Sequence, residues 1–399
     1  MKCNKHKGLK LEGYLLSVII PTKNRYRYLI ECIDTLNRIK SNKLEIIIQD
    51  NSDDNSEILD YISKLESSNV KYFHTTGIRS QTDNYNDAIA NSTGEFVLGL
   101  GDDDSITSAA IKVAELMKLY DIDACNMNMF GYYWPDVFNH NFSKPPLSYD
   151  RRSPKLEKVI TSEILDKYLS TGMQDLKYLP RIYHGILSRR VLNKIQDVSG
   201  AFCPGPSPDM ANAVAASTFI NWHLMLRYPI IVSGSAYNSA AGKGLRGEHT
   251  GSLSQVKQLP KNVEQGWDSK IPKVWLGNTI WPESAKQALK KVGHLTKADS
   301  LNYYPMYARV FIKHPEYRGL VLDNIKGFRS SSLLYFWCLR EVCSWFTRTY
   351  KNKLKVFFGI EYTHKEIISL KKACEMAEIH LEKDINSLDR LFSNLLGSK

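Results

Sequence analysis

Three adjacent carboxylates, Asp102, Asp103 and Asp104, follow the apolar run at residues 96–100. Removing even one charged carboxylate from water is costly, so these side chains must face solvent, a cation or a basic partner. Hard cations such as Mg²⁺ and Mn²⁺ prefer oxygen ligands and usually keep positions open for substrate phosphates. The triplet therefore predicts a metal–diphosphate site at the end of a strand. A solvated acidic loop is the alternative.

The elements that must position this triplet alternate between strand-like and helix-like segments. The apolar runs cover residues 15–20, 44–48, 70–74, 96–100 and 122–129. The segments between them repeat apolar residues at helical spacing. Apolar strands that alternate with helices indicate an α/β fold with a mostly parallel, doubly wound sheet.

Polar residues stand at four of the expected strand ends, where such sheets bind their ligands. They are Pro21 and Thr22, Asp50, the Gly77 turn with Arg79, and Asp102–Asp104. We expect one crevice suited to a nucleotide diphosphate that is bound through a metal. Neither G-x-x-x-x-G-K-[ST] nor G-x-G-x-x-G opens any of the helices. The metal and side chains must therefore neutralise the phosphates.

Four motifs in this order resemble family-2 glycosyltransferases of the GT-A fold. The motifs are residues 17–25, 45–54, 94–98 and 102–104. The resemblance is strong over residues 16–104 and looser to about residue 250. It implies a Rossmann-like GT-A catalytic domain over residues 1–255, followed by a mainly helical domain over 256–399, where strand-like runs disappear. Gln49 stands where many relatives carry a second Asp, so the base and the donor sugar stay open.

The resemblance also implies roles for individual residues. Asp50 would contact the nucleotide, and Asp103 and Asp104 would bind Mn²⁺ or Mg²⁺. The further residues expected at the donor are Pro21, Thr22, Asn24, Arg25, Arg79 and Asp102. Asn24 is also expected to cap the helix that follows it. A solvated loop arginine is the alternative for Arg79.

Asp209 opens an expected helix over residues 211–218. GT-A enzymes that invert the anomeric centre usually supply a carboxylate from a helix start in this region, and it removes the proton of the acceptor hydroxyl. The resemblance therefore implies that Asp209 is the general base. A helix cap is the alternative role.

The glycine-rich segment 242–249 follows an expected strand at 230–232. We expect a flexible loop that closes over the donor phosphates, with Lys243 and Arg246 meeting their charge. Many GT-A enzymes add a late histidine to the metal ligands, and His249 stands at that place. A surface histidine is the alternative.

The composition limits the number of domains and the cellular location that we expect. A chain of 399 residues with ordinary apolar content suits a globular protein with two domains. Its seven cysteines are scattered without a C-x-x-C pair, and the first 13 residues are polar and basic. Both features predict a cytoplasmic protein in a reducing environment. No stretch approaches the length of an uncharged membrane span.

Basic and aromatic residues interleave over residues 318–358. From 318 to 355, eight Lys or Arg stand against two acidic residues, which gives +6 of the formal +11. This pattern suits peripheral attachment to an anionic surface, and we expect it on the inner face of the cell membrane. A core helix with snorkelling bases and a nucleic-acid patch are the alternatives, and we expect no nucleic-acid partner.

Apolar residues follow a 3–4 spacing over residues 367–395. Such a stripe could pair with a second copy of the chain as a short coiled coil, which would make a homo-oligomer. Packing on its own domain is the alternative, and we favour it.

These observations predict a metal-dependent, inverting glycosyltransferase of the hexosyltransferase type. It would move a sugar from a nucleotide-sugar donor, with UDP-sugars favoured, to a hydroxyl of a glycan or lipid-linked glycan. The resemblance alone places it in assembly of a bacterial surface polysaccharide. A sugar-nucleotide pyrophosphorylase is an alternative, but its glycine-rich signature is missing after the first strand. A non-catalytic protein that binds nucleic acid or membrane would leave the strand-end carboxylates unexplained.

Overall fold

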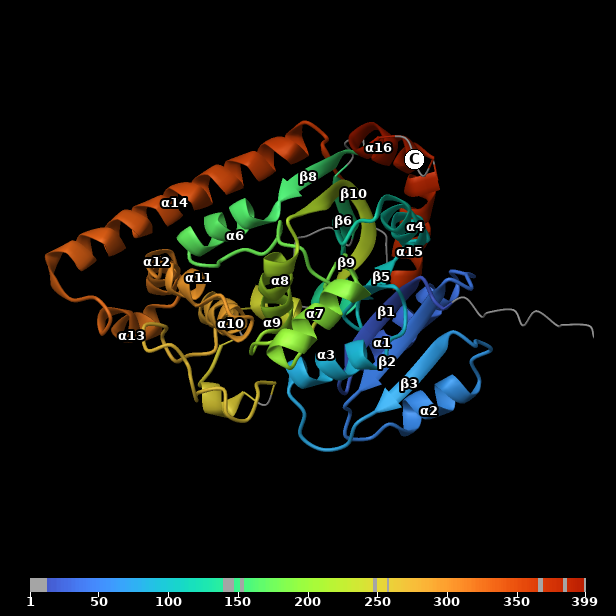
Figure 1. Ribbon diagram of the computed structural model, residues 1–399, viewed down its shortest axis with the longest axis horizontal. Helices are drawn as coiled ribbons and strands as arrows, with labels where there is room; N and C mark the ends of the chain where they lie inside the picture. The colour runs from blue at the N-terminus through green and yellow to red at the C-terminus, as the bar shows by residue number, and fades with distance from the viewer. Residues whose placement is uncertain are drawn as a thin grey trace, which may run out of the picture.

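A computed structural model describes residues 13–138, 147–150, 154–246, 250–256, 258–364, 369–382 and 386–397. The described strands form one sheet (Figure 1). They are β1 (Leu16–Thr22), β2 (Leu44–Asp50), β3 (Val70–His74), β4 (Phe96–Gly99), β5 (Ser105–Ile106), β6 (Ala124–Tyr133), β7 (Leu147–Asp150), β8 (Leu156–Ile160), β9 (Gly185–Ser188), β10 (Trp222–Ser235) and β11 (Glu361–His364).

The helices lie between and after these strands. They are α1 (Tyr26–Asn37), α2 (Ser56–Ser63), α3 (Gln81–Ala90), α4 (Ala109–Tyr120), α5 (Pro135–Phe138), α6 (Thr161–Ser170), α7 (Arg189–Ser199), α8 (Pro208–Phe219), α9 (Ala240–Leu245), α10 (Gly277–Lys291), α11 (Leu295–Asp299), α12 (Tyr304–Lys313), α13 (Arg318–Leu322), α14 (Gly327–Phe357), α15 (Leu370–Glu382) and α16 (Ser387–Leu396). Two short 3₁₀ helices are η1 (Leu253–Gln255) and η2 (Pro315–Tyr317).

The sheet is parallel at one side and mixed at the other. Its main path runs β11-β7-β6-β9-β4-β1-β2-β3, and β10 pairs with β5, β6 and β8. Strands β1 to β4 are parallel to one another, whereas β9 enters antiparallel between β4 and β6. Among the eleven described strands, seven therefore point one way, and β5, β7, β8 and β9 point the other way. The predicted α/β fold with a mostly parallel sheet is confirmed.

Helices cover both faces of the sheet because its strands are apolar on both faces. Ile20 belongs to a core that includes residues of α1, α4, α15 and α16. Its neighbour Ile19 points the other way, into a core that includes residues of α3, α7 and α8. Successive residues of a strand face opposite sides, so a continuous apolar run requires both layers. The doubly wound arrangement is thus a direct consequence of the strand composition.

The chain after residue 255 first leaves the sheet and then returns to it. A separate apolar core gathers residues of α10, α12 and α14 against α6 and the first half of α8. Strand β11 then joins the sheet beside β7 and becomes its edge, and α15 and α16 pack on the sheet core. The predicted division at residue 255 stays a prediction. Among the described residues, no helix combines the length and apolarity that a bilayer crossing requires.

The predicted apolar stripe at 367–395 is used inside the chain. Leu370, Ala377, Leu381 and Leu388 are at most 1% exposed and belong to the sheet core. This is the packing that we favoured, and a second copy could use these residues only if they left that core. Residue 367 lies outside the described residues. Oligomerisation itself stays a prediction.

Substitution of Leu388 should separate a packing role from a surface role. Leu388→Asp places a charge in the sheet core and removes a buried side chain, so we expect the free energy of unfolding to fall by about 3 kcal/mol. Leu395→Asp, on the same helix and 40% exposed, is the matched control. Equal midpoints in urea denaturation for the two variants would contradict the packing.

Candidate active site

The ends of β1, β2 and β4 come together because their register is parallel. Thr22 lies opposite Asp50, and Ile19 lies opposite Gly99, so the chain beyond β4 runs past the end of β1. The Thr22 hydroxyl donates a hydrogen bond to Asp102 Oδ2 at 2.7 Å. The predicted meeting of strand ends therefore occurs, and it places the triplet beside Thr22.

All three carboxylates of the triplet are buried. Asp102, Asp103 and Asp104 are 2%, 4% and 0% exposed, so the solvated acidic loop is ruled out. Burial of this kind requires hydrogen bonds and opposite charge. The hydrogen-bond and ion-pair partners differ among the three carboxylates.

Asp104 is held by donors that occupy both of its oxygens. The Gly234 N–H donates to Oδ1 at 2.7 Å, and the Gly101 N–H donates to Oδ2 at 2.8 Å. His184 Nε2 lies 2.7 Å from Oδ2, and the Tyr183 hydroxyl donates to it over 3.3 Å. Asp104 thus ties the loop after β4 to β10 and to the turn before β9.

Gly234 in β10 permits the close approach of the triplet to this strand. A Cβ at Gly234 would lie 1.8 Å from the carbonyl oxygen of Asp103, so any side chain there would displace the triplet. Sequence reasoning missed Gly234. A glycine inside a strand is a sign of close backbone approach, and that signal was available.

Arg25 is the counter-charge of the other two carboxylates. Its Nη1 lies 2.7 Å from Asp102 Oδ1, and its Nη2 lies 3.2 Å from Asp103 Oδ2. The Ala236 N–H donates to the same Asp103 oxygen at 3.0 Å. Burial would lower the pKa of Arg25, but the charges of Asp102 and Asp103 outweigh it and raise the pKa. Arg25 therefore stays a cation.

Burial also acts on the carboxylates. It raises the pKa of Asp103 to about 7 and raises the pKa of Asp102, while Arg25 lowers both. Desolvation favours the neutral acid, and a nearby cation favours the carboxylate. The charge state of this pair is therefore set by the cation that lies beside it.

The donor chemistry of the triplet fits a hard divalent cation only in part. Asp102 Oδ1 is a buried carboxylate oxygen that accepts no hydrogen bond, and Asp103 lies on the other side of the same guanidinium. Asp104, a predicted ligand, already has both oxygens occupied, and the predicted ligand His249 lies outside the described residues. Across the described part of the chain, no three His, Cys, Asp or Glu side chains form a metal site. A divalent cation would have to take the place of Arg25.

Asp50 is enclosed by hydroxyl groups. The Tyr26 and Tyr72 hydroxyls donate to Oδ2 at 2.6 and 2.8 Å. The Ser52 N–H and hydroxyl donate to Oδ1 at 2.8 and 2.6 Å. Asp50 therefore shapes the turn after β2, and its contact with a nucleotide stays a prediction.

A hollow of about 560 Å³ opens beside Arg25. Its walls come from the start of α1, the turn after β2 and the turn after β10, and they include Asn24, Arg27, Asp53, Asp54, Tyr28 and Asn238. Because Arg25 both lines this hollow and touches the triplet, the hollow and the buried carboxylates form one site.

Asn24 does not cap α1 as expected. The N-cap position is Arg25, and no side chain makes a capping hydrogen bond there. Asn24 adopts a left-handed φ of 56° and exchanges two hydrogen bonds with Asp53, at 2.8 and 3.0 Å. Asp53, in the turn after β2, thus binds the Asn24 side chain that the sequence predicted as the cap of α1.

Two of the three basic residues predicted near the donor, Arg79 and Arg246, have protein partners. Arg79 forms an ion pair with Asp87 of α3. The segment predicted as a flexible loop begins as the short helix α9, which contains Lys243. Arg246 donates to the Tyr237 carbonyl at 2.8 Å and stacks over its ring at 3.7 Å. The phosphate contacts of these three residues stay predictions.

Asp209 stands in the first turn of α8, but it is not the cap. Ser207 occupies the N-cap position, so the capping alternative is not realised. The Ser207 hydroxyl and the Met210 N–H both donate to Asp209 Oδ1. Burial raises the pKa of Tyr85 and Tyr183, and the charges of Asp104 and Asp209 add to both shifts. Asp209 and Asp104 are therefore both near enough to these two tyrosines for their charges to act on them.

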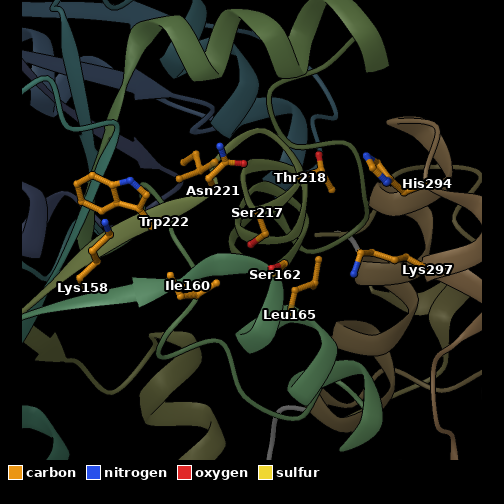
Figure 2. A pocket seen from close by; sticks show the side chains of 11 residues that line it. Lys158, Ile160, Ser162, Leu165, Ser217, Thr218, Asn221, Trp222, His294 and Lys297 are labelled. Atoms are coloured by element: carbon orange, nitrogen blue, oxygen red, sulfur yellow. The ribbon is translucent and has the colours of Figure 1, made fainter.

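A second hollow, of about 400 Å³, lies at the other end of α8 (Figure 2). Ser217 and Thr218 line it, about 13 Å along the helix from Asp209 at 1.5 Å per residue. Its two lysines already have partners, since Lys158 lies 4.2 Å from the Trp222 ring centre and Lys297 pairs with Asp166 of α6. This hollow is not part of the site at the triplet.

Comparison with known proteins gives a consistent set of similarities. Residues 17–202 match the family described as "Glycosyl transferase family 2". Over 99 residues the chain is 34% identical to a Campylobacter jejuni protein named GalNAc(5)-diNAcBac-PP-undecaprenol beta-1,3-glucosyltransferase. That match covers 24% of this chain and 32% of the relative, so the chain spans about a third of the length of this curated protein.

Solved structures with similar folds are more distant. Residues 1–349 of S. aureus TarS in complex with UDP-GlcNAc align with a TM-score of 0.44 and 16% identity, over 78% of this chain and 89% of that one. The mannosyltransferase PcManGT from Pyrobaculum calidifontis, in complex with GDP-Man and Mn²⁺, aligns with a TM-score of 0.38 and 14% identity, over 94% of this chain and 88% of that one.

Removal of Arg25 should show how much the buried carboxylates lower the free energy of unfolding when they have no counter-charge. In Arg25→Ala, Asp102 and Asp103 lose their counter-charge, so we expect the free energy of unfolding without metal to fall by about 3 kcal/mol. Mn²⁺ should then stabilise the variant more than the original protein, because no guanidinium competes with it. Urea denaturation with and without Mn²⁺ measures both effects.

Arg27→Ala, an exposed arginine two residues further along α1, is the control for this experiment. It should change the unfolding free energy little with or without Mn²⁺. An Arg25→Ala variant as stable as the original protein in the absence of metal would show that Arg25 does not neutralise the triplet.

Proposed function

We propose that the chain transfers one sugar from a nucleotide-sugar donor to a hydroxyl of a glycan or lipid-linked glycan. Its residues 17–202 belong to glycosyl transferase family 2, which makes the chain a glycosyltransferase. The observation that carries the proposal is the carboxylate triplet buried at the strand ends beside Thr22 and Arg25. A further carboxylate, Asp209, is near enough to Tyr183, which donates to Asp104, for its charge to add to the rise that burial causes in the pKa of that tyrosine. A donor diphosphate and an acceptor hydroxyl need such groups on either side of the reacting carbon.

The donor would lie over Arg25 and the hollow beside it. We favour a UDP-sugar with Mn²⁺ or Mg²⁺, and Asp102 and Asp103 would hold the ion because Asp104 is already occupied. When bound, the ion would act as a Lewis acid for the departing diphosphate. Arg25, released from the two carboxylates, would remain within reach of the phosphates as a second positive charge.

The acceptor side would depend on Asp209. The two donors to Asp209 within the described residues both use Oδ1, which leaves Oδ2 for an acceptor hydroxyl. Ser207 and the Met210 N–H hold the carboxylate in one orientation, so Oδ2 can remove the hydroxyl proton as the oxygen attacks. A base on the face opposite the leaving diphosphate implies inversion at the anomeric centre.

The similarity to the Campylobacter protein supports a lipid-linked acceptor, since that protein is named for glucosyl transfer to a PP-undecaprenol-linked glycan. An acceptor of this kind is held at a membrane surface. We therefore propose that the enzyme works in the cytoplasm on the inner face of the cell membrane, with residues 318–358 as the contact region.

Nucleotide binding tests the donor site directly. Calorimetry with UDP, GDP, CDP and dTDP, with and without Mn²⁺, should find one class that binds more tightly with the metal. Asp103→Asn keeps the shape of the side chain but removes its charge, so it should weaken metal-dependent binding at least about tenfold. The folded state of the variant is checked by circular dichroism. A folded original protein that binds no nucleotide at millimolar concentration would contradict the transferase proposal.

Substitution of Asp209 tests the base. Asp209→Asn removes the proton acceptor and keeps the side chain volume, so kcat should fall by about 10²- to 10⁴-fold while nucleotide affinity stays the same. Transfer of labelled sugar to a lipid extract of bacterial membranes provides the assay. Asp197→Asn, on the exposed side of α7, is the control. An unchanged kcat in Asp209→Asn would assign the proton transfer to another residue.

A further inference from the structure

The long helix α14 is bound to the rest of the protein along one face only. It has 31 residues, which corresponds to about 46 Å, and it forms one long edge of the molecule (Figure 1). Leu334 is 2% exposed and packs with Trp337 and Cys338 against the core of the C-terminal helices. Glu341 on the same face accepts ion pairs from Arg309 of α12 and from Arg348.

The opposite face of α14 carries a stripe of large apolar side chains. The stripe consists of Phe328, Tyr335, Leu339, Val342, Phe346, Tyr350 and Phe357, which are between 39% and 89% exposed. Their spacings of three, four or seven residues place them on one side of a helix. Exposed apolar patches of this extent mark a surface that is covered in the working protein.

Basic side chains accompany this stripe. Arg329, Arg340 and Lys351 follow one flank of it, and Lys353 lies within it. Within the described residues, none of the four forms an ion pair, and Arg340 stacks over the Trp337 ring at 4.9 Å. The one acidic residue of α14, Glu341, is turned inward to its own arginines. The outer face therefore carries net positive charge that no acidic side chain among the described residues balances.

The charge decides which occupant suits this face. A second copy of α14 would bring like charges together, and the stripe has aromatic residues where a coiled-coil seam has Leu, Ile or Val. An anionic bilayer offers both an apolar boundary for aromatic side chains and negative headgroups for the flanking bases. The helix is too polar to cross a bilayer, so it would lie in the plane of the surface.

We propose that the outer face of α14 lies in the interface of an anionic lipid bilayer. Its aromatic stripe enters the boundary between headgroups and acyl chains, and the flanking bases contact the headgroups. The inference deepens the membrane contact of residues 318–358 that is part of the proposed function, by naming the lipid class and the helix face. Its evidence is the exposure and charge of this helix, not the transfer reaction. It specifies the orientation of the protein, because the stripe and the Glu341 face are on opposite sides of the helix.

Flotation of the full chain with lipid vesicles tests the proposal. One set of vesicles is phosphatidylcholine alone, and in the other about a third of the lipid is phosphatidylglycerol. We expect the original protein to float with the anionic vesicles and to lose binding as salt is raised. Leu339→Glu/Phe346→Glu should bind at least about tenfold more weakly. Arg340→Gln/Lys351→Gln/Lys353→Gln should lose the preference for anionic lipid.

The matched control is Val198→Glu/Leu295→Glu, which changes two exposed apolar residues on α7 and α11. It should float like the original protein. Urea denaturation and UDP binding of every variant are measured on the same preparations, so a failure of the donor site is seen separately from a failure of lipid binding.

Two results would overturn the proposal. One is an original protein that does not float with anionic vesicles at low salt, or that floats no better than the Leu339→Glu/Phe346→Glu variant. The other is a dimer in light scattering that this variant converts to a monomer, because a second copy of the chain would then cover the stripe.

Discussion

The burial of three adjacent carboxylates is the constraint on which this structure depends. Charged groups at the end of a parallel sheet could have been left to solvent, but here they are enclosed and must be neutralised. Arg25 supplies the positive charge, and the backbone N–H groups of Gly234 and Ala236 supply hydrogen bonds from a distant strand. The start of α1 and the end of β10 are therefore fixed by the triplet as much as by their own apolar faces.

This arrangement connects stability with the proposed chemistry. A guanidinium between Asp102 and Asp103 neutralises the two carboxylates, and in the proposed enzyme a divalent ion would take over that role. Asp104 has the opposite role. Its four hydrogen-bond partners make it a structural centre that holds the loop after β4 in place.

Two apolar stripes with similar helical spacing end in different environments. The stripe on α15 and α16 enters the sheet core, where Leu388 is fully buried, whereas the stripe on α14 stays outside. The return of the chain to the sheet through β11 separates them. The first stripe stabilises the catalytic domain, and the second leaves a basic, aromatic surface for a partner.

Local periodicity was enough to locate β1 to β4 and β6 and to predict that Thr22, Asp50 and Asp102 meet at one edge, because parallel strands of continuous apolar residues bring their carboxyl ends together. It did not find β5, β7, β8, β9 or β11, and β11 lies in the region where we expected no strands. Tertiary structure alone decided that Asp104 anchors the loop, that Arg25 occupies the other carboxylates and that α14 turns its aromatic face outward. These outcomes depend on partners far along the chain, such as Gly234, which lies 130 residues from Asp104. Residue type and spacing determine which groups need a partner, whereas the packing of the whole chain determines which partner reaches them.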